Sequence, residues 1–219
     1  MQFRTAILIL CMSSVPGFAA TQSLFTTINR PAETTADESA PRRPRRERTP
    51  APPRTGNACE KEMIRASKRY QIPVNILYAV GLTETGRRGS LQPYAMNIEG
   101  TPFFGSSAQD AIRRFRSARA GGARLIDLGC MQINHHYHNK QFPSLEAMLT
   151  PKHNVDYAAR FLKELRQREG NWTMAVARYH AGPNNNPAQK RYICRVITNM
   201  VTVGMGQWTP QARQFCDKS

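Results

Sequence analysis

The sequence is short of acidic residues and of long hydrophobic runs. Asp and Glu number 15 against 31 Lys and Arg in 219 residues, which gives a formal net charge of +16. No apolar run approaches the roughly 20 residues that a membrane-spanning helix needs, so a polytopic membrane protein is excluded. The basic excess indicates an anionic partner, and charge alone leaves nucleic acid, acidic lipid and an acidic cell-wall glycan as candidates.

Metal-binding spacings are missing as well. The sequence has no Cys-x-x-Cys pair, and the clustered His135, His136 and His138 lack the His-x-x-x-His spacing that places two ligands on one helix face. His153 and His180 lie elsewhere in the chain. We therefore predict no metal site and no cofactor.

The first 57 residues differ in composition from the rest. Residues 1–20 contain Arg4, a short apolar run and then the small residues Gly17, Ala19 and Ala20, the order of a secretory signal peptide cleaved after Ala19 or Ala20. Residues 21–57 are rich in Pro and Arg and have no periodicity, so we expect a disordered linker. The signal predicts a periplasmic protein without a stable membrane span after cleavage.

Charge and cysteine content agree with export. Residues 58–219 carry +12 of the net charge, so the basicity belongs mainly to the folded part. Once the signal is removed, four cysteines remain, and in an oxidising compartment they predict two disulfides. The residues alone leave all three possible pairings open. Export disfavours nucleic acid as the partner. The four cysteines are Cys59, Cys130, Cys194 and Cys216.

Residues 58–219 are predicted to form one mainly α-helical domain. Apolar residues recur at three- and four-residue steps, and Ser, Pro and Gly occupy capping positions at the ends of these segments. Strand-like alternation is scarce, and only residues 125–134 could hold a small β-hairpin. The helices expected cover residues 59–70, 73–86, 107–121, 151–165, 172–181 and 187–200.

Three segments carry the candidate chemistry. Glu84 ends an otherwise apolar helix, where lost hydration and the helix dipole favour the protonated carboxyl that a general acid needs. Gln132 and Asn134 stand in a short apolar run, and buried amides need polar partners such as a ligand in a cleft. Tyr179 and His180 end a further helix at a glycine.

At these segments the chain resembles the transglycosylase SLT family, the lytic transglycosylases with a goose-type lysozyme-like fold. The resemblance covers about residues 59–195. One departure is His180, where the family usually has asparagine. Residues 93–100 resemble a motif found in one subgroup of the family, which serves secretion systems and other envelope-spanning machines. Such a machine is therefore a candidate partner. The matching motifs are Glu84-Thr85, Gly129-Cys130-Met131-Gln132-Ile133-Asn134, Ala177-Arg178-Tyr179-His180-Ala181-Gly182 and Tyr192.

The resemblance implies a reaction and a set of site residues. Glu84 would protonate the glycosidic oxygen between N-acetylmuramic acid and N-acetylglucosamine in peptidoglycan and then act as base, which leaves a 1,6-anhydro end. Tyr179 would hydrogen-bond Glu84 or the substrate. The resemblance also favours a Cys59–Cys130 disulfide, which leaves Cys194–Cys216. The expected substrate-binding residues are Gln132, Asn134, Tyr179, Asn97, Tyr192 and Met131.

Two other functions stay open at this point. If Asp127 or Glu99 lies opposite Glu84 across the cleft, a hydrolytic lysozyme-type muramidase becomes the better interpretation. The second alternative is a non-catalytic murein-binding assembly protein that uses the cleft for docking, although an intact Glu84 argues against it.

Overall fold

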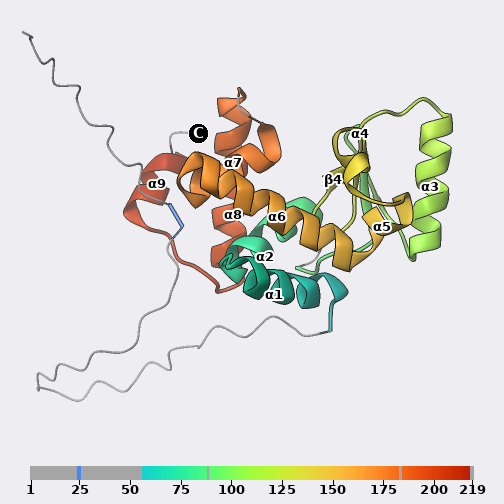
Figure 1. Ribbon diagram of the computed structural model, residues 1–219. Coiled ribbons are helices and arrows are strands. Elements are labelled where there is room, and N and C mark those ends of the chain that lie inside the picture. Colours follow the sequence, from blue (N-terminus) through green and yellow to red (C-terminus); the bar gives the residue numbers. More distant parts are fainter. Residues whose placement is uncertain (1–23, 26–55, 88, 183, 218–219) are drawn as a thin grey trace, which may run out of the picture.

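The computed structural model describes residues 24–25, 56–87, 89–182 and 184–217 (Figure 1). The predicted signal peptide and most of the predicted linker lie outside these residues. Four linker residues, 24–25 and 56–57, are described, and the first two pack on the domain: Phe25 is buried in the hydrophobic core, and the backbone N–H of Leu24 donates to Oγ1 of Thr173 at 2.8 Å. Leu24 and Phe25 therefore contact the folded domain, and the disordered linker stays a prediction.

Helices dominate the described part of the chain, as predicted. A short 3-10 helix, Asn139–Gln141, follows α4. The nine α-helices of this part are α1 Ala58–Tyr70, α2 Val74–Thr85, α3 Ala108–Ala120, α4 His135–His138, α5 Leu145–Leu149, α6 Pro151–Glu169, α7 Trp172–Ala181, α8 Asn186–Thr202 and α9 Pro210–Asp217.

Capping side chains explain where several helices begin. Oδ1 of Asn57 accepts from the N–H of Cys59 at the start of α1, and Oγ of Ser107 accepts from the N–H of Asp110 at the start of α3. Asn171 caps α7 in the same way, and the preceding α6 ends at Gly170 in the left-handed conformation. These are the residue types that mark helix boundaries in the sequence.

The core is organised around α2, which is apolar on nearly all sides. Residues 76–82 of this helix are all buried, and α2 packs against α1 and α8. Gly81 lets Met63 and Leu91 pack directly against α2: a Cβ there would lie 2.4 Å from Cε of Met63 and 3.1 Å from Cδ2 of Leu91, so both side chains would have to shift. Close packing on every face fixes the position of the C-terminal end of α2, where Glu84 lies.

The sheet is larger than the single hairpin expected. Four antiparallel strands pair in the order β2-β1-β3-β4: β1 is Ala95–Ile98, β2 Thr101–Phe104, β3 Ile126–Leu128 and β4 Ile133–Asn134. The expectation failed because strands of two to four residues are too short to show alternation. A tight turn joins β1 to β2, with Glu99 at φ 49° and Gly100 at φ 92°, the conformation that two-residue hairpin turns require.

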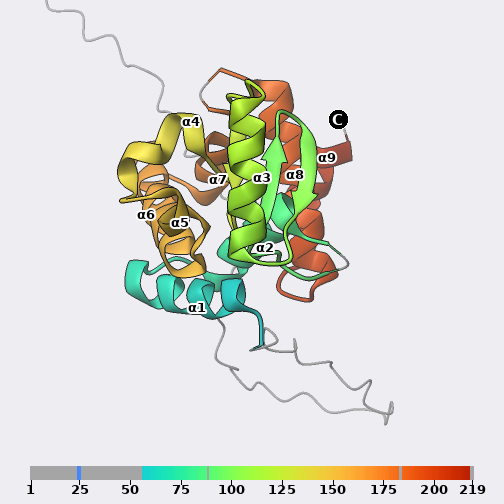
Figure 2. The same cartoon turned by 90° about the vertical axis from the view of Figure 1, so that its right-hand side faces the viewer.

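The sheet and the long helices occupy different sides of the molecule. In Figure 1, α3, α4, α5 and the sheet lie to one side, while α1, α2, α6, α7, α8 and α9 form the larger helical part; Figure 2 shows α3 packed beside the sheet. The cleft described below is lined by residues of both parts.

Two disulfides, Cys59–Cys130 and Cys194–Cys216, are present in the structure. The first joins the start of α1 to the loop between β3 and β4, across 71 residues of sequence, and the second holds α9 against α8 across 22 residues. None of the helices in the described ranges combines the length and hydrophobicity that a membrane span requires.

Candidate active site

A cleft of about 850 Å³ brings the three sequence motifs together. The end of α2 contributes Glu84 to its lining, the sheet contributes the polar residues, and α7 contributes Tyr179 and His180. Asn97 and Asp127 also line it. Other cleft residues are Ala95, Met96, Gly100, Pro102, Phe104, Gln132, Ile133, Asn134, Tyr137, His138, Phe161, Ala181, Gly182 and Asn185.

Glu84 is held by a short hydrogen bond. The hydroxyl of Tyr192, from α8, donates to its Oε1 at 2.6 Å. Nδ1 of His180 lies 3.7 Å from the same oxygen, and the imidazole stacks flat on the Tyr192 ring at a centroid distance of 4.1 Å. The Glu84 side chain is 13% exposed, which leaves it open to the cleft alone. A carboxyl group with a fixed direction and limited water contact is suited to transferring a proton to a bound ligand.

Two tyrosines near Glu84, Tyr179 and Tyr192, stay protonated. Burial raises the pKa of both Tyr179 and Tyr192 well above the ordinary value of 10.0, and the negative charge of Glu84 adds to both shifts. Tyr192 is fully buried and does not line the cleft, and its hydroxyl reaches the cleft only through its hydrogen bond to Glu84. Tyr179 was expected to bond Glu84 or substrate; its hydroxyl donates instead to the carbonyl of Met131 at 2.7 Å.

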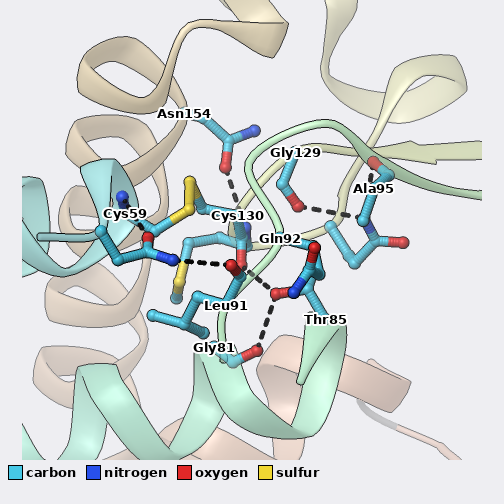
Figure 3. The surroundings of a disulfide bond; sticks show 12 residues. Cys59, Gly81, Thr85, Leu91, Gln92, Ala95, Gly129, Cys130 and Asn154 are labelled. Atoms are coloured by element: carbon cyan, nitrogen blue, oxygen red, sulfur yellow. Dashed lines mark hydrogen bonds between the residues drawn. A yellow bond between two sulfur atoms is a disulfide. The ribbon is translucent and has the colours of Figure 1, made fainter. Parts of the chain in front are cut away.

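Thr85 anchors the end of α2 to the loop that carries the second motif. Its Oγ1 donates to the carbonyl oxygens of Gly81 (3.1 Å) and Cys130 (3.3 Å), as Figure 3 shows. Cys130 is also tied to α1 through its disulfide to Cys59. The hydrogen bond from Thr85 therefore ties the residue next to Glu84 to the loop, and the disulfide ties the same loop to α1.

Asn154, a residue that the sequence motifs do not include, organises the same loop. It is fully buried on α6, and its Oδ1 accepts from the N–H of Met131 at 2.9 Å. Its Nδ2 donates to the carbonyls of Leu128 (2.8 Å) and Met148 (2.9 Å). Gly129 fits against it only because it lacks a Cβ, which would lie 2.7 Å from Nδ2. A polar residue inside the apolar stripe of α6 is the sequence signal that could have identified it.

Asn97, Asp127 and Asn134 form a polar row across three strands. Asn97 of β1 is paired in register with Asp127 of β3, and Asp127 with Asn134 of β4. The amide Nδ2 of Asn97 donates to Oδ2 of Asp127 at 3.2 Å, and Nδ2 of Asn134 donates to Oδ1 at 2.7 Å. Oδ1 of Asn97 is buried and has no hydrogen-bond partner among the described residues. It is thus a buried acceptor that the described residues leave unsatisfied.

Asp127 is a second carboxyl group in the cleft. Burial raises its pKa above the ordinary 3.8, and the charge of Glu84 raises it further, against the lowering effect of the two amide bonds and of His180. Glu99, the other candidate for a second carboxylate, is exposed at the β1–β2 turn, where its Oε1 accepts from the N–H of Arg124; it does not line the cleft.

The remaining predicted residues have mixed placements. Gln132 lines the cleft at φ 45°, and its Nε2 donates to the carbonyls of Ala95 and Gly129, which leaves its oxygen for a ligand. Asn134 lines the cleft but also caps α4 by accepting from the N–H of His136. The side chain of Met131 is fully buried in the hydrophobic core and does not line the cleft.

The histidines do not gather into a metal site. Nδ1 of His138 is 2.8 Å from the Tyr157 hydroxyl, His135 packs on Phe115, and His180 is at Glu84. The ranges that the structure describes hold no group of three His, Cys, Asp or Glu side chains placed to bind a metal ion.

Fold and site together define a lysozyme-like, glycan-cleaving class of domain: a helical body, a small sheet, and a glutamate facing a cleft lined with amides. The chain belongs to the transglycosylase SLT family, because the family model described as "Transglycosylase SLT domain" matches residues 61–195. This membership supports a glycan-cleaving function of the lytic transglycosylase type, with peptidoglycan as substrate. Neither a comparison with curated proteins nor one with solved structures gives a match.

Replacing Tyr192 by Phe is expected to lower glycan cleavage about tenfold, because the variant loses the hydrogen bond that orients Glu84 while keeping the ring. Initial rates of muropeptide release measure the effect. Tyr70→Phe is the matched control: its hydroxyl donates to a carboxylate too, Oδ1 of Asp156 at 2.9 Å, but outside the cleft. Equal rates for wild type and Tyr192→Phe would remove Tyr192 from the positioning of the acid.

Replacing Asp127 by Asn is expected to make the variant more stable, relative to wild type, as pH rises. Because its folded-state pKa is raised, the stability that protonated Asp127 contributes is complete below its ordinary pKa of 3.8 and is lost as pH rises through the raised value. Urea unfolding at several pH values measures this. The variant also loses one of the hydrogen bonds from Asn97 and Asn134, which changes its free energy of unfolding by the same amount at every pH. The prediction is therefore tested by how the difference in stability changes with pH. A difference that stays constant or shrinks with pH contradicts burial as the dominant cause.

Proposed function

We propose that the protein is an exported peptidoglycan lytic transglycosylase. It cleaves the β-1,4 bond between N-acetylmuramic acid and N-acetylglucosamine and leaves a 1,6-anhydro-muramic acid end. One observation carries this proposal: the only acidic residue of α2, Glu84, is directed into the cleft by a 2.6 Å bond from Tyr192. The family assignment supports it.

In the proposed mechanism Glu84 acts twice. Its carboxyl group first protonates the glycosidic oxygen, so that the bond to the anomeric carbon of the muramic acid breaks and the N-acetylglucosamine leaves as an alcohol. The resulting carboxylate then takes the proton from the C6 hydroxyl of the same muramic acid, whose oxygen bonds to the anomeric carbon. Glu84 ends protonated, as it began, and no water is consumed. The hydroxyl of Tyr192 holds Oε1 of Glu84 in place through both steps.

The cleft side chains have separate roles in this proposal. The oxygen of Gln132 is the acceptor left free for an N-acetyl group, since its amide nitrogen is already engaged. Asn97 lines the cleft, and its amide nitrogen holds Asp127. Asn134 donates to Asp127 and caps α4, so both ends of its amide are engaged. Its role in this proposal is to shape the cleft and not to bind substrate.

Asp127 favours a second candidate function, hydrolysis on the same fold. A second carboxylate in the cleft could activate water on the other face of the sugar, as inverting glycosidases do, and Asp127 lines the same cleft as Glu84. The two reactions differ in their products. Lytic cleavage gives an anhydro end, whereas hydrolysis gives a reducing end that carries one more water.

We place the protein outside the cytoplasm, in the periplasm. Two disulfides require an oxidising compartment, and peptidoglycan lies there. The +12 charge of residues 58–219 favours association with a wall whose peptide stems carry carboxylates.

Digestion of purified sacculi by the wild type and by Glu84→Gln, with the soluble products identified by mass, tests the proposed function. We expect anhydro-muropeptides from the wild type alone. Binding to sacculi without release of any product would instead support a non-catalytic murein-binding protein, and reducing ends would support hydrolysis.

A further inference from the structure

The cleft contains aromatic side chains that the proposed reaction does not use. Among the described residues three large hydrophobic side chains are exposed: Phe104 (38%), Leu125 (43%) and Tyr137 (69%). Phe104 and Tyr137 line the cleft, and Leu125 does not. Exposed apolar surface inside a cleft marks a binding surface, whereas single exposed apolar residues elsewhere are ordinary.

These two aromatic residues flank the polar row at its opposite ends. Pro102 of β2 pairs with Asn97, and Phe104 lies two residues further along β2, on the same face of the sheet. At the other end of the row, β4 ends at Asn134, and Tyr137 lies three residues later in α4. From β2 to β4 the sheet has four strands, so the distance between its two edge strands is about 14 Å at roughly 4.8 Å per strand. Such a span is longer than one pyranose ring.

Neighbouring side chains hold both rings in place. The guanidinium of Arg87 lies over the Phe104 ring, 4.9 Å from its centroid. The Tyr137 ring makes edge contacts with His136, at a centroid distance of 4.9 Å, and with His138, at 6.4 Å. Both rings are therefore exposed to the cleft and also restrained by their neighbours. A ligand that packs on them then loses less affinity to the ordering of these side chains.

We propose that Phe104 and Tyr137 are stacking platforms for two separate sugar rings of the glycan, so that the substrate lies across all four strands with the bond that Glu84 cleaves between the platforms. β-linked N-acetylhexosamine rings present faces of C–H groups, which pack on aromatic faces, while their amide and hydroxyl groups meet the polar row. The inference rests on the proposed function, because it takes a peptidoglycan-type glycan as the ligand.

Glycan binding by the full chain carrying Glu84→Gln tests the proposal without interference from cleavage. Chitohexaose and chitobiose are titrated by calorimetry into this parent and into the same chain with Phe104→Ala or Tyr137→Ala added. Each alanine should weaken chitohexaose binding about tenfold, the factor expected from losing one aromatic packing surface. Chitobiose is too short to reach both rings, so at least one of the two substitutions should leave its affinity unchanged.

Leu125→Ala is the matched control, since it removes an equally exposed side chain outside the cleft and should change affinity less than twofold. Phe104→Tyr and Tyr137→Phe keep the rings and should bind like the parent, which separates stacking from misfolding. Parent-like affinity of both alanine variants, or no chitohexaose binding by the parent, overturns the proposal. Sacculus digestion by the wild type in parallel distinguishes the two failures: if digestion persists, the proposed function stands and only the platforms are wrong.

Discussion

Replacing Glu84 by Gln is expected to reduce glycan cleavage by about 10²- to 10⁴-fold, the range over which a positioned general acid contributes to rate. The glutamine keeps the size of the side chain and an oxygen that can accept from Tyr192, so the fold and the cleft should stay intact. Only the transferable proton is lost. Initial rates of muropeptide release from sacculi, at equal concentrations of folded protein, measure the effect.

Glu99→Gln is the control for this change. Glu99 is an exposed glutamate at the β1–β2 turn, outside the cleft, and its substitution should leave the rate within a factor of about two. A Glu84→Gln variant that digests sacculi at the wild-type rate would remove Glu84 from the mechanism. Unfolding midpoints of the variants confirm that any loss of rate is not a loss of structure.

Replacing Asn154 by Leu is expected to lower the free energy of unfolding by about 4 kcal/mol, because three buried backbone groups lose their partner at roughly 1–3 kcal/mol each. Those groups are the N–H of Met131 and the carbonyls of Leu128 and Met148. The leucine has similar volume, so the cost comes mainly from lost hydrogen bonds and not from a cavity. Urea unfolding monitored by circular dichroism measures it.

Asn139→Leu separates this effect from a general intolerance of leucine. Asn139 is partly buried and donates one side-chain hydrogen bond, to the carbonyl of His135 at 2.8 Å, so its loss should cost about 1 kcal/mol. If the two variants are equally stable, Asn154 does not hold the loop. Because that loop carries Gln132, we also expect Asn154→Leu to lose activity under conditions in which it is still folded.

Six of the helices (α1, α2, α3, α6, α7 and α8) and the central glutamate were predictable from local chemistry, whereas the shorter α4, α5 and α9 were not predicted. The boundaries of α7 follow from Asn171 at its start and Gly182 beyond its end, and the predicted range of residues 172–181 is the one found. Glu84 stands out because a carboxylate in an apolar helix conflicts with burial unless it has a task. Both are short-range signals that a sequence contains directly.

The sheet and the contacts behind Glu84 were not predictable in the same way. The polar row depends on the register of strands that begin near residues 95, 126 and 133, and such short segments do not specify register. The bond from Tyr192 to Glu84 joins residues 108 positions apart. Tyr179 and Tyr192 are similar candidates in the sequence, and only the packing of α7 and α8 on α2 decides which hydroxyl reaches the carboxyl group.

The most direct test of the central claim is digestion of sacculi by the wild type in water labelled with heavy oxygen, followed by mass spectrometry of the new glycan ends. If Glu84 acts first as acid and then as base on the C6 hydroxyl, the ends are anhydro-muramic acid and contain no label. Reducing ends that carry one labelled oxygen would contradict the lytic mechanism and support hydrolysis.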